Sequence, residues 1–219
     1  LLKGMPDYLV NVYLVGDVLI DAGTKLAQNG LLRQLKGQRL SAHVLTHVHP
    51  DHQGASKAIC DHFGIPLLCG DADAAAMESG DMRGQIPRNL VTQTQDIFWT
   101  GPAHPVERTL REGDLIAGFT VIETPGHSPG HLAYWRESDR TLILGDVVNN
   151  IDFLTLRTRL GEPPTIFTQD IQQNRASAVK LAALRPRIVL FGHGKPLLDG
   201  ARFVDFAAQI AAEPMPLAG

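Results

Sequence analysis

Three histidines and one aspartate lie within six consecutive positions, 47–52 (HVHPDH), which Thr46 separates from the mostly apolar run 42–45. On an extended segment, side chains two residues apart point the same way, so His47 and His49 can reach one ion together. Asp51 and His52 fall where the loop is expected to turn into a helix, where they can face a second ion. A structural zinc site would need cysteines at tetrahedral spacing, and none is nearby. The cluster therefore predicts a metal site rather than a bare surface patch of histidines.

Three more candidate ligands each follow an apolar run rich in β-branched residues. His127 follows the run 119–122, Asp146 follows 141–144 and His193 follows 188–191. Each run is bounded by Gly or Pro, as a buried strand would be. Glycine next to each of these residues allows a sharp turn close to an ion. Open α/β folds place their sites at the carboxyl ends of strands, so these side chains are expected to meet the histidine cluster there.

The order of these residues resembles the metallo-β-lactamase superfamily of metal-dependent hydrolases. The pattern is H-x-H-x-D-H, then a distant His, an Asp and a final His, and the early segments 10–15 and 18–23 resemble the opening strand pair of that family. The resemblance implies an α/β fold, the four-layer αββα sandwich. It also implies that one metal is held by His47, His49 and His127, that a second is held by Asp51, His52 and His193, and that Asp146 bridges both.

A site of this kind carries hydrolytic chemistry. Two divalent ions about 3.5–4 Å apart can hold a bridging hydroxide and polarise a carbonyl oxygen. A metal lowers the pKa of its bound water towards ~7, so no protein nucleophile is needed. Asp51 is the catalytic candidate, as a proton-handling group, with a plain ligand role as the equal alternative. Zinc is the expected metal, with iron or manganese as alternatives, because nitrogen and oxygen donors suit all three.

The ligand set favours the general hydrolase branch, of the glyoxalase II type, over true β-lactamases. The two cysteines, Cys60 and Cys69, lie at no ligand position, and an aspartate occupies the bridging position. The expected reaction is hydrolysis of an ester-type bond, a thioester or lactone, in a small substrate. Lactonases of the family often carry Tyr three residues after the bridging Asp, and Asn149 stands there instead. The open alternatives are a mononuclear iron sulfur (persulfide) dioxygenase of the same fold, a phosphodiesterase and a non-catalytic binding protein.

Composition is that of a globular protein forming one domain over residues 1–219. The chain is 44% hydrophobic and 20% charged, which argues against disorder. A net charge of −3 gives no attraction to nucleic acid. No apolar run reaches transmembrane length and no signal-peptide pattern opens the sequence. We therefore expect a small-molecule substrate as partner, neither nucleic acid nor membrane, and a cytoplasmic location that suits two cysteines without an evident disulfide. The oligomeric state is left open.

The periodicity of the sequence predicts alternating strands and helices around two long insertions. The first insertion, 80–105, is expected to be irregular, and both insertions, 80–105 and 149–170, are expected to shape the pocket. Their aromatic residues and the cations Arg157 and Arg159 would suit an acyl substrate with an anionic tail, although solvated arginines are an equal alternative. Helices are predicted over 24–36, 53–63, 71–78, 170–184 and 200–212, and strands over 9–15, 18–21, 41–45, 66–69, 119–123, 131–135, 141–144 and 187–190.

Several further polar residues are assigned supporting roles or none. Asp21, at the end of a predicted strand, is a candidate to orient a ligand, with a turn aspartate as the alternative. His131 is expected to pack at the start of a strand rather than to hydrogen-bond around the site. Three other histidines are expected to be structural or exposed: His43, His62 and His104.

Overall fold

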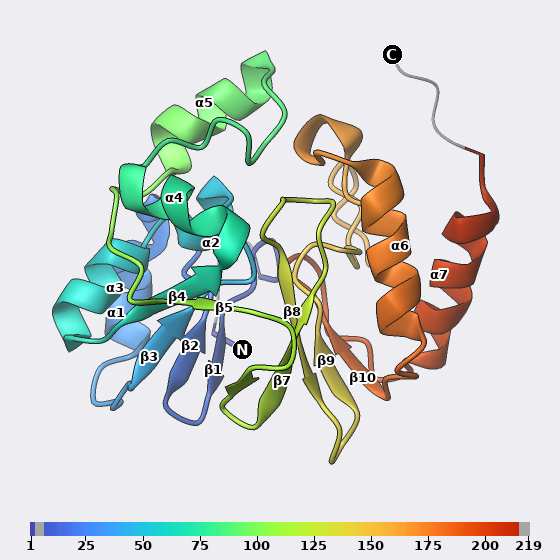
Figure 1. Cartoon of the computed structure of the whole chain (residues 1–219), viewed down its shortest axis with the longest axis horizontal. Coiled ribbons are helices and arrows are strands. Elements are labelled where there is room, and N and C mark those ends of the chain that lie inside the picture. Colours follow the sequence, from blue (N-terminus) through green and yellow to red (C-terminus); the bar gives the residue numbers. More distant parts are fainter. Residues whose placement is uncertain (3–6, 215–219) are drawn as a thin grey trace.

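Two five-stranded sheets pack face to face between two layers of helices (Figure 1). The structure is a computed structural model, and it describes residues 1–2 and 7–214. The first sheet has the order β1-β2-β3-β4-β5; its β1–β2 pair is antiparallel and its other pairs are parallel. The second has the order β10-β9-β8-β7-β6, and only β10–β9 is parallel. The strands are β1 (Tyr13–Val15), β2 (Val18–Ile20), β3 (Ala42–Val44), β4 (Leu67–Gly70), β5 (Arg108–Leu110), β6 (Leu115–Ile116), β7 (Phe119–Glu123), β8 (Leu132–Arg136), β9 (Thr141–Ile143) and β10 (Ile188–Leu190).

Helices cover the outer faces of both sheets. In Figure 1, α1, α3 and α4 lie on the side of the first sheet, α6 and α7 lie on the side of the second, and α5 stands at the upper edge. The four-layer αββα arrangement expected from the sequence is therefore confirmed. The helices are η1 (Lys25–Ala27), α1 (Gln28–Gln34), α2 (Pro50–Gln53), α3 (Ser56–Phe63), α4 (Asp71–Ser79), α5 (Leu90–Trp99), η2 (Thr165–Phe167), α6 (Ile171–Ala182) and α7 (Ala201–Ala212).

Three apolar clusters hold the layers together. One lies between the first sheet and its helices, one between the second sheet and α6 and α7, and the third between the two sheets. Burying one Val, Leu, Ile or Phe side chain contributes about 1.5–3 kcal/mol, so these clusters supply the main favourable term in folding. Two hydrogen bonds join the sheets near the histidine cluster: Leu132 N donates to Thr46 O at 2.7 Å, and Tyr134 Oη donates to Leu45 O at 2.6 Å. The carboxyl end of β3 is thereby fixed against the second sheet.

All eight predicted strands and all five predicted helical regions are confirmed, with shifted ends. The first strand begins at Tyr13 rather than residue 9, and the region predicted over 53–63 begins at Pro50 and divides into α2 and α3. Among the described residues no helix combines the length and apolar character needed to cross a bilayer. These comparisons concern the described part of the chain.

The expectation that 80–105 is irregular is wrong, because it contains α5. Leu90, Ile97 and Phe98 of this helix are exposed, so no apolar stripe faces a core and the periodicity signal is weak. The helix begins instead with a capping box, in which Asn89 accepts from Thr92 N and Thr92 Oγ1 accepts from Asn89 N. The strands β5 and β6 were also not predicted, since two or three residues are too few to show an alternation.

Candidate metal centre

The histidine cluster leaves β3 as an extended loop and enters α2 at Pro50. His49 is the N-cap residue, with φ −59° and ψ 152°, and Pro50 takes the first helical turn, where its missing N–H costs nothing. Asp51 and His52 therefore lie on the first turn of a helix while His47 and His49 lie on the loop before it. The predicted change from loop to helix at this point is confirmed.

The later candidate ligands lie at the carboxyl ends of β7, β9 and β10, as expected. Two glycines allow the chain ends of these strands to come close together around Asp146. Gly145, beside Asp146, has φ +57°, a conformation that glycine adopts at little cost. At Gly192 a Cβ atom would lie 1.9 Å from Asp146 Oδ1, so no side chain fits between the ends of β9 and β10.

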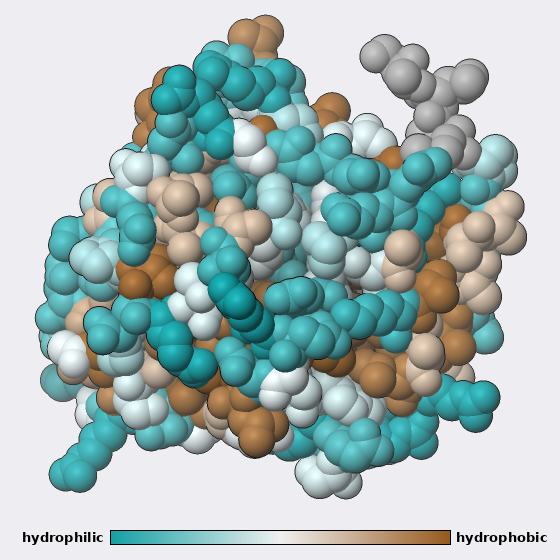
Figure 2. All heavy atoms as spheres, viewed as in Figure 1, coloured by the Kyte–Doolittle hydropathy of each residue, from teal (hydrophilic) through white to brown (hydrophobic). Residues whose placement is uncertain are grey.

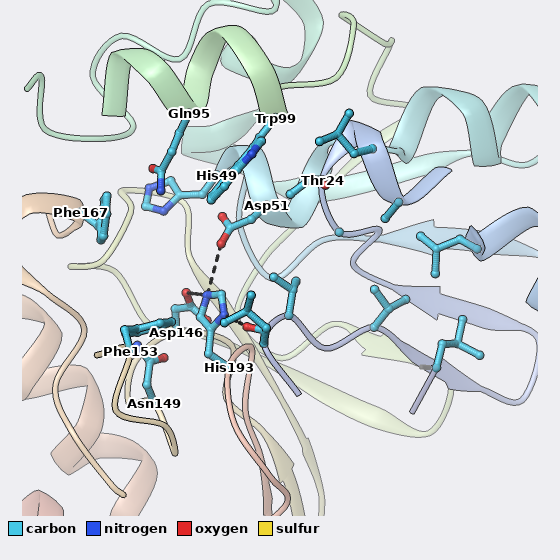
Figure 3. A pocket seen from close by; sticks show the side chains of 18 of the residues that line it. Thr24, His49, Asp51, Gln95, Trp99, Asp146, Asn149, Phe153, Phe167 and His193 are labelled. Atoms are coloured by element: carbon cyan, nitrogen blue, oxygen red, sulfur yellow. Dashed lines mark hydrogen bonds and ion pairs between the residues drawn. The ribbon is translucent and has the colours of Figure 1, made fainter. Parts of the chain in front are cut away.

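All seven predicted site residues converge on one buried centre. Their ligand atoms form three groups in which every atom lies within 4.8 Å of the others. Asp146 lies centrally, with its Oδ2 2.9 Å from His193 Nε2 and 3.4 Å from His52 Nε2. Asp51 Oδ2 lies 3.3 Å from His193 Nε2, and Figure 3 shows Asp51, Asp146 and His193 facing one cavity. The groups are His47, His49 and His127; His47, His52 and Asp146; and Asp51, His52 and His193.

In each of the five histidines a hydrogen bond fixes one ring nitrogen, and the other ring nitrogen is available to bind a metal ion. His49 is the only one of the five bonded through Nε2, which lies 2.9 Å from Gln85 O. This arrangement is typical of metal-binding histidines, because the outer partner fixes the tautomer and the ring orientation. The other four bond through Nδ1: His47 to Thr46 Oγ1 at 3.0 Å, His52 to Asp21 Oδ2 at 2.9 Å, His127 to Thr168 Oγ1 at 3.2 Å, and His193 to Leu9 O.

Four buried atoms of the centre have no hydrogen-bond partner among the described residues. They are the Nε2 atoms of His47, His52 and His127 and the Oδ1 atom of Asp146. A buried polar atom without a partner costs about 1–3 kcal/mol, so folded proteins rarely leave several together. Divalent cations bound by these groups would satisfy the four atoms, and the nitrogen and oxygen donors suit zinc, iron and manganese. The residues present therefore fit a metal centre.

The electrostatics divide the centre into two parts. Burial and the neighbouring imidazoles hold the pKa of His47 and of His127 well below the usual value, so these rings are neutral and able to bind a cation. Burial also opposes a charge on His193, but Asp146 and Asp51 outweigh it and raise the pKa of His193 to about 10. The carboxylates around His52 and His193 thus attract positive charge, which a proton or a metal ion can supply.

A family model described as the metallo-beta-lactamase superfamily matches residues 5–193. The chain belongs to this superfamily. It is 30% identical to the probable metallo-hydrolase YflN of Bacillus subtilis over 89% of this chain and 84% of that protein. It is also 30% identical, over 50% of this chain and 35% of the relative, to a hydroxyacylglutathione hydrolase of Bdellovibrio bacteriovorus. Among solved structures, TTHA1623 in a di-iron-bound form is 30% identical, with a TM-score of 0.69 over 94% of this chain and 98% of that one.

Asp21 orients the candidate ligand His52, as the sequence suggested. Its side chain accepts hydrogen bonds from Thr46 N at 2.8 Å and Thr46 Oγ1 at 2.9 Å as well as from His52. Its backbone has φ +61°, in the left-handed region where Asp and Asn are tolerated better than most residues. Asp21 is thus bound into the site and is not a free turn residue.

Both alternatives for His131 hold: the ring is buried at the start of β8, as expected, and it also hydrogen-bonds in the site. Its Nε2 accepts from Asp146 N at 3.1 Å and its Nδ1 lies 2.8 Å from Thr124 Oγ1. The other three expectations hold: His43 is buried and bonded to Leu19 O and Ser56 Oγ, His62 is exposed, and His104 lies beside Asp61.

Asp73 is a site residue that sequence reasoning missed. It is fully buried on α4, where it accepts from Gly130 N at 2.7 Å, Val48 N at 3.1 Å and Ser128 Oγ at 3.4 Å. Burial raises the pKa of Asp73 to about 7. It ties the loop of His47 and His49 to the loop of His127. The sequence did contain a signal for Asp73: it follows the predicted strand that became β4, just as the histidine cluster follows β3, and the carboxyl ends of parallel strands lie at the same edge of a sheet.

A cavity of about 1260 Å³ opens over the centre, and both insertions line it as expected. Segment 80–105 contributes Ile86, Gln95 and Trp99, and segment 149–170 contributes a larger set. Of the two alternatives for Arg157 and Arg159, the structure favours solvated side chains: both arginines are exposed, neither lines the cavity, and Arg159 lies beside Asp152. The contribution of segment 149–170 is Asn149, Phe153, Leu154, Pro163, Pro164, Ile166 and Phe167.

Proposed function

We propose that this chain is a metal-dependent hydrolase that holds two divalent cations and cleaves an ester-type bond, a thioester or a lactone, in a small-molecule substrate. One observation carries the proposal. Five imidazoles, each with one ring nitrogen held by a hydrogen bond, and two carboxylates turn their remaining ligand atoms towards one buried centre. Membership of the superfamily and the similarity to proteins named as metallo-hydrolases support it.

The proposed ligands divide between two positions. His47, His49 and His127 would hold one cation, and Asp51, His52 and His193 would hold the other. Asp146 would contact both, in keeping with its central place beside His193 and His52. Zinc is the metal we expect, with iron and manganese as alternatives, and TTHA1623 holds two irons in a related structure. Bound cations would polarise the carbonyl group and lower the pKa of an attacking water molecule.

Asp51 is the proposed proton-handling residue. It lines the cavity and its side chain is 20% exposed, compared with 5% for Asp146, so it is the more accessible carboxylate of the centre. Burial alone would raise the pKa of Asp51, but the charges of His52 and His193 and the hydrogen bond from His193 lower it overall. The carboxylate is thus ionised at neutral pH. It can accept a proton from the attacking water and pass it to the leaving group.

Aromatic side chains line this end of the site. The Phe153 ring meets the His193 ring edge to face at a centroid distance of 5.2 Å. Trp99 and Phe167 lie above the carboxylates on opposite sides of the cavity (Figure 3). An ester-type substrate is favoured because its uncharged acyl group suits these apolar walls, which offer no Lys or Arg among their described residues to the charged phosphate of a phosphodiester. The partial similarity to a hydrolase of hydroxyacylglutathione, a thioester, supports this choice.

The test is a substrate panel on protein of measured metal content. Zinc-loaded protein is assayed with thioesters, lactones, phosphodiesters and β-lactams, and iron-loaded protein is assayed for oxygen consumption with a persulfide. We expect turnover of thioesters or lactones at two metals per chain. The Asp146→Ala variant should lose the second metal and nearly all turnover. Full metal content and activity in that variant, or turnover confined to phosphodiesters or the persulfide, would overturn the proposal.

A further inference from the structure

The end of the cavity between α5 and segment 153–167 is more apolar than a small polar substrate requires. Apolar side chains form both walls, and the polar members beside them are Gln95 and Asn149. Among the described lining residues the single Lys or Arg is Arg33, which belongs to α1 and to neither of these walls. The apolar members are Ile86 and Trp99 on one wall, and Phe153, Leu154, Ile166 and Phe167 on the other.

The volume of the cavity also exceeds what a small acyl group needs. Binding sites for drug-sized ligands measure about 300–1,000 Å³. This cavity has a volume of about 1260 Å³, and the candidate ligands His49, Asp51, Asp146 and His193 line it together with the apolar walls. A substrate whose carbonyl carbon lies at the centre would therefore leave this apolar end empty unless another part of the same molecule filled it.

Several apolar side chains of these walls are exposed to water. Leu154 is 97% exposed, and Ile166 and Phe153 are exposed to 46% and 40%. Single exposed apolar residues are common on proteins, but a group of them around a site marks a binding surface. Figure 2 shows further apolar atoms at the tip and flank of the uppermost helix, α5, which carries the exposed residues Leu90 and Phe98.

The two walls are distant in sequence but are joined at their rim. Asn89, the N-cap of α5, donates from Nδ2 to Ile166 O at 2.8 Å. This bond holds α5 against η2, so the groove between them is built into the fold. At its inner end Phe153 packs on the His193 ring. The groove therefore leads from the protein surface to the proposed metal centre.

We propose that this groove binds the alkyl chain of the substrate, so that the preferred substrates are thioesters or esters of medium- and long-chain fatty acids. This inference rests on the proposed hydrolase function. A membrane surface or a second copy of the chain could cover the outer side of α5, but neither accounts for apolar walls that continue down to His193. An alkyl chain attached to the reacting carbonyl carbon accounts both for the apolar surface at the rim and for the apolar walls that continue down to His193.

The reaction is a hydrolysis and needs no other reactant. The oxygen of a water molecule bonds to the acyl carbonyl carbon, and the bond from that carbon to the leaving sulfur or oxygen breaks. The leaving atom keeps the electron pair of that bond. A proton from the water reaches it through Asp51, and the products are the fatty acid and a thiol or an alcohol.

Binding of the alkyl chain is tested on metal-free protein with ω-bromoalkanols of four to ten carbons. Bromine quenches tryptophan fluorescence, and one of the two tryptophans, Trp99, lies in the groove wall, whereas Trp135 is buried in β8. We expect saturable quenching whose affinity rises by up to about fourfold per methylene, the factor for full burial of a CH₂ group. The quenching should disappear in Trp99→Phe. Leu154→Ala and Phe167→Ala should weaken binding several-fold, whereas Leu156→Ala, an exposed leucine of the same segment outside the cavity, should not.

Kinetics on zinc-loaded protein complete the test with acyl thioesters of two to twelve carbons. The value of kcat/KM should rise with chain length in the wild type and in Leu156→Ala, and should rise less steeply with chain length in Leu154→Ala and Phe167→Ala. Turnover that is independent of chain length, without quenching, would overturn the inference and leave the hydrolase function intact. Quenching without turnover of any thioester or ester would overturn the hydrolase function. The same variants are tested for binding to lipid vesicles and for dimer formation. If the wild type shows no quenching, and Leu154→Ala loses either vesicle binding or a dimer that the wild type forms, the surface belongs to a membrane contact or to a second copy of the chain, and the inference is overturned.

Discussion

Asp21 connects the two halves of the proposed metal centre without being a ligand itself. Thr46 Oγ1 donates its single proton to Asp21 Oδ2, so it accepts from His47 Nδ1. His52 Nδ1 donates to the same carboxylate. Both rings therefore carry their proton on Nδ1 and turn the Nε2 lone pair to the centre. One residue thus fixes the tautomer of a histidine in each ligand set.

Replacing Asp21 with Asn should therefore weaken metal binding while preserving the fold. Asn tolerates the left-handed backbone at this position. Its amide group has one oxygen, and if that oxygen keeps the bond from Thr46 N, its NH₂ group faces His52 Nδ1. His52 must then carry its proton on Nε2, where it blocks coordination. We expect metal affinity to fall about 10–100-fold. Competition with a chromophoric chelator measures the affinity, and circular dichroism checks the fold.

Asp17→Asn is the matched control, since Asp17 is an exposed aspartate in the turn between β1 and β2. Its affinity for metal should equal that of the wild type. An Asp21→Asn protein that binds metal as tightly as this control would show that the carboxylate does not set the tautomer.

At the scale of elements, the centre depends on how closely the start of α4 approaches the loop between β7 and β8. Asp73 accepts from this loop at Gly130 N, and a Cβ atom on Gly130 would lie 2.4 Å from Asp73 Oδ1. A Cβ atom on Gly70, at the end of β4, would lie 2.0 Å from Gly130 O. The loop that carries His127 is held in place by contacts that leave no room for a side chain.

Gly130→Ala should consequently destabilise the protein and weaken its metal site together. An extra methyl group in a filled space typically costs about 1–3 kcal/mol, because neighbouring atoms must move. We expect a loss of that size in the free energy of unfolding, measured by urea denaturation of metal-free protein, and a lower affinity for metal. Gly161→Ala, where a Cβ atom meets no atom within 4 Å, should change neither property. Equal urea midpoints for the two variants would contradict this account of the contact.

At the scale of the whole molecule, the candidate ligands come from both sheets. His47, His49, Asp51 and His52 follow β3 of the first sheet, and His127, Asp146 and His193 follow strands of the second. A bound metal pair would therefore link the two halves of the fold. The unfolded chain does not hold these groups together, so metal binding should stabilise the folded state.

We expect removal of metal by a chelator to lower the melting temperature. At a free metal concentration of 100 times Kd each bound metal contributes about 2.7 kcal/mol. For a chain of this size 1 kcal/mol corresponds to roughly 2–4 °C, so the shift should be about 5–11 °C for each metal that is removed. Calorimetry with and without chelator measures it, and Asp146→Ala should show a smaller shift. Identical melting curves for the wild type would contradict metal binding at this centre.

The ligand positions and most strands could be predicted from the sequence because each depends on a short local pattern. The stretch 47–52 and the Gly-flanked residues His127, Asp146 and His193 are each readable in a few residues. Buried strands are also marked locally by apolar, β-branched runs between turn residues. The helix α5 lacked such a mark because its apolar residues face water.

Only the tertiary structure decided how these pieces support one another. Three sets of hydrogen bonds join residues that lie 15 to 77 positions apart: those of Asp73 with Gly130 N and Val48 N, that of His131 with Asp146 N, and that of Asn89 with Ile166 O. A sequence records which groups are present, but the partner of each depends on which surfaces the packed sheets bring together. For that reason the sequence by itself determined the family and the residues of the candidate centre. The folded chain decided which ring nitrogens face the centre and which walls enclose the substrate.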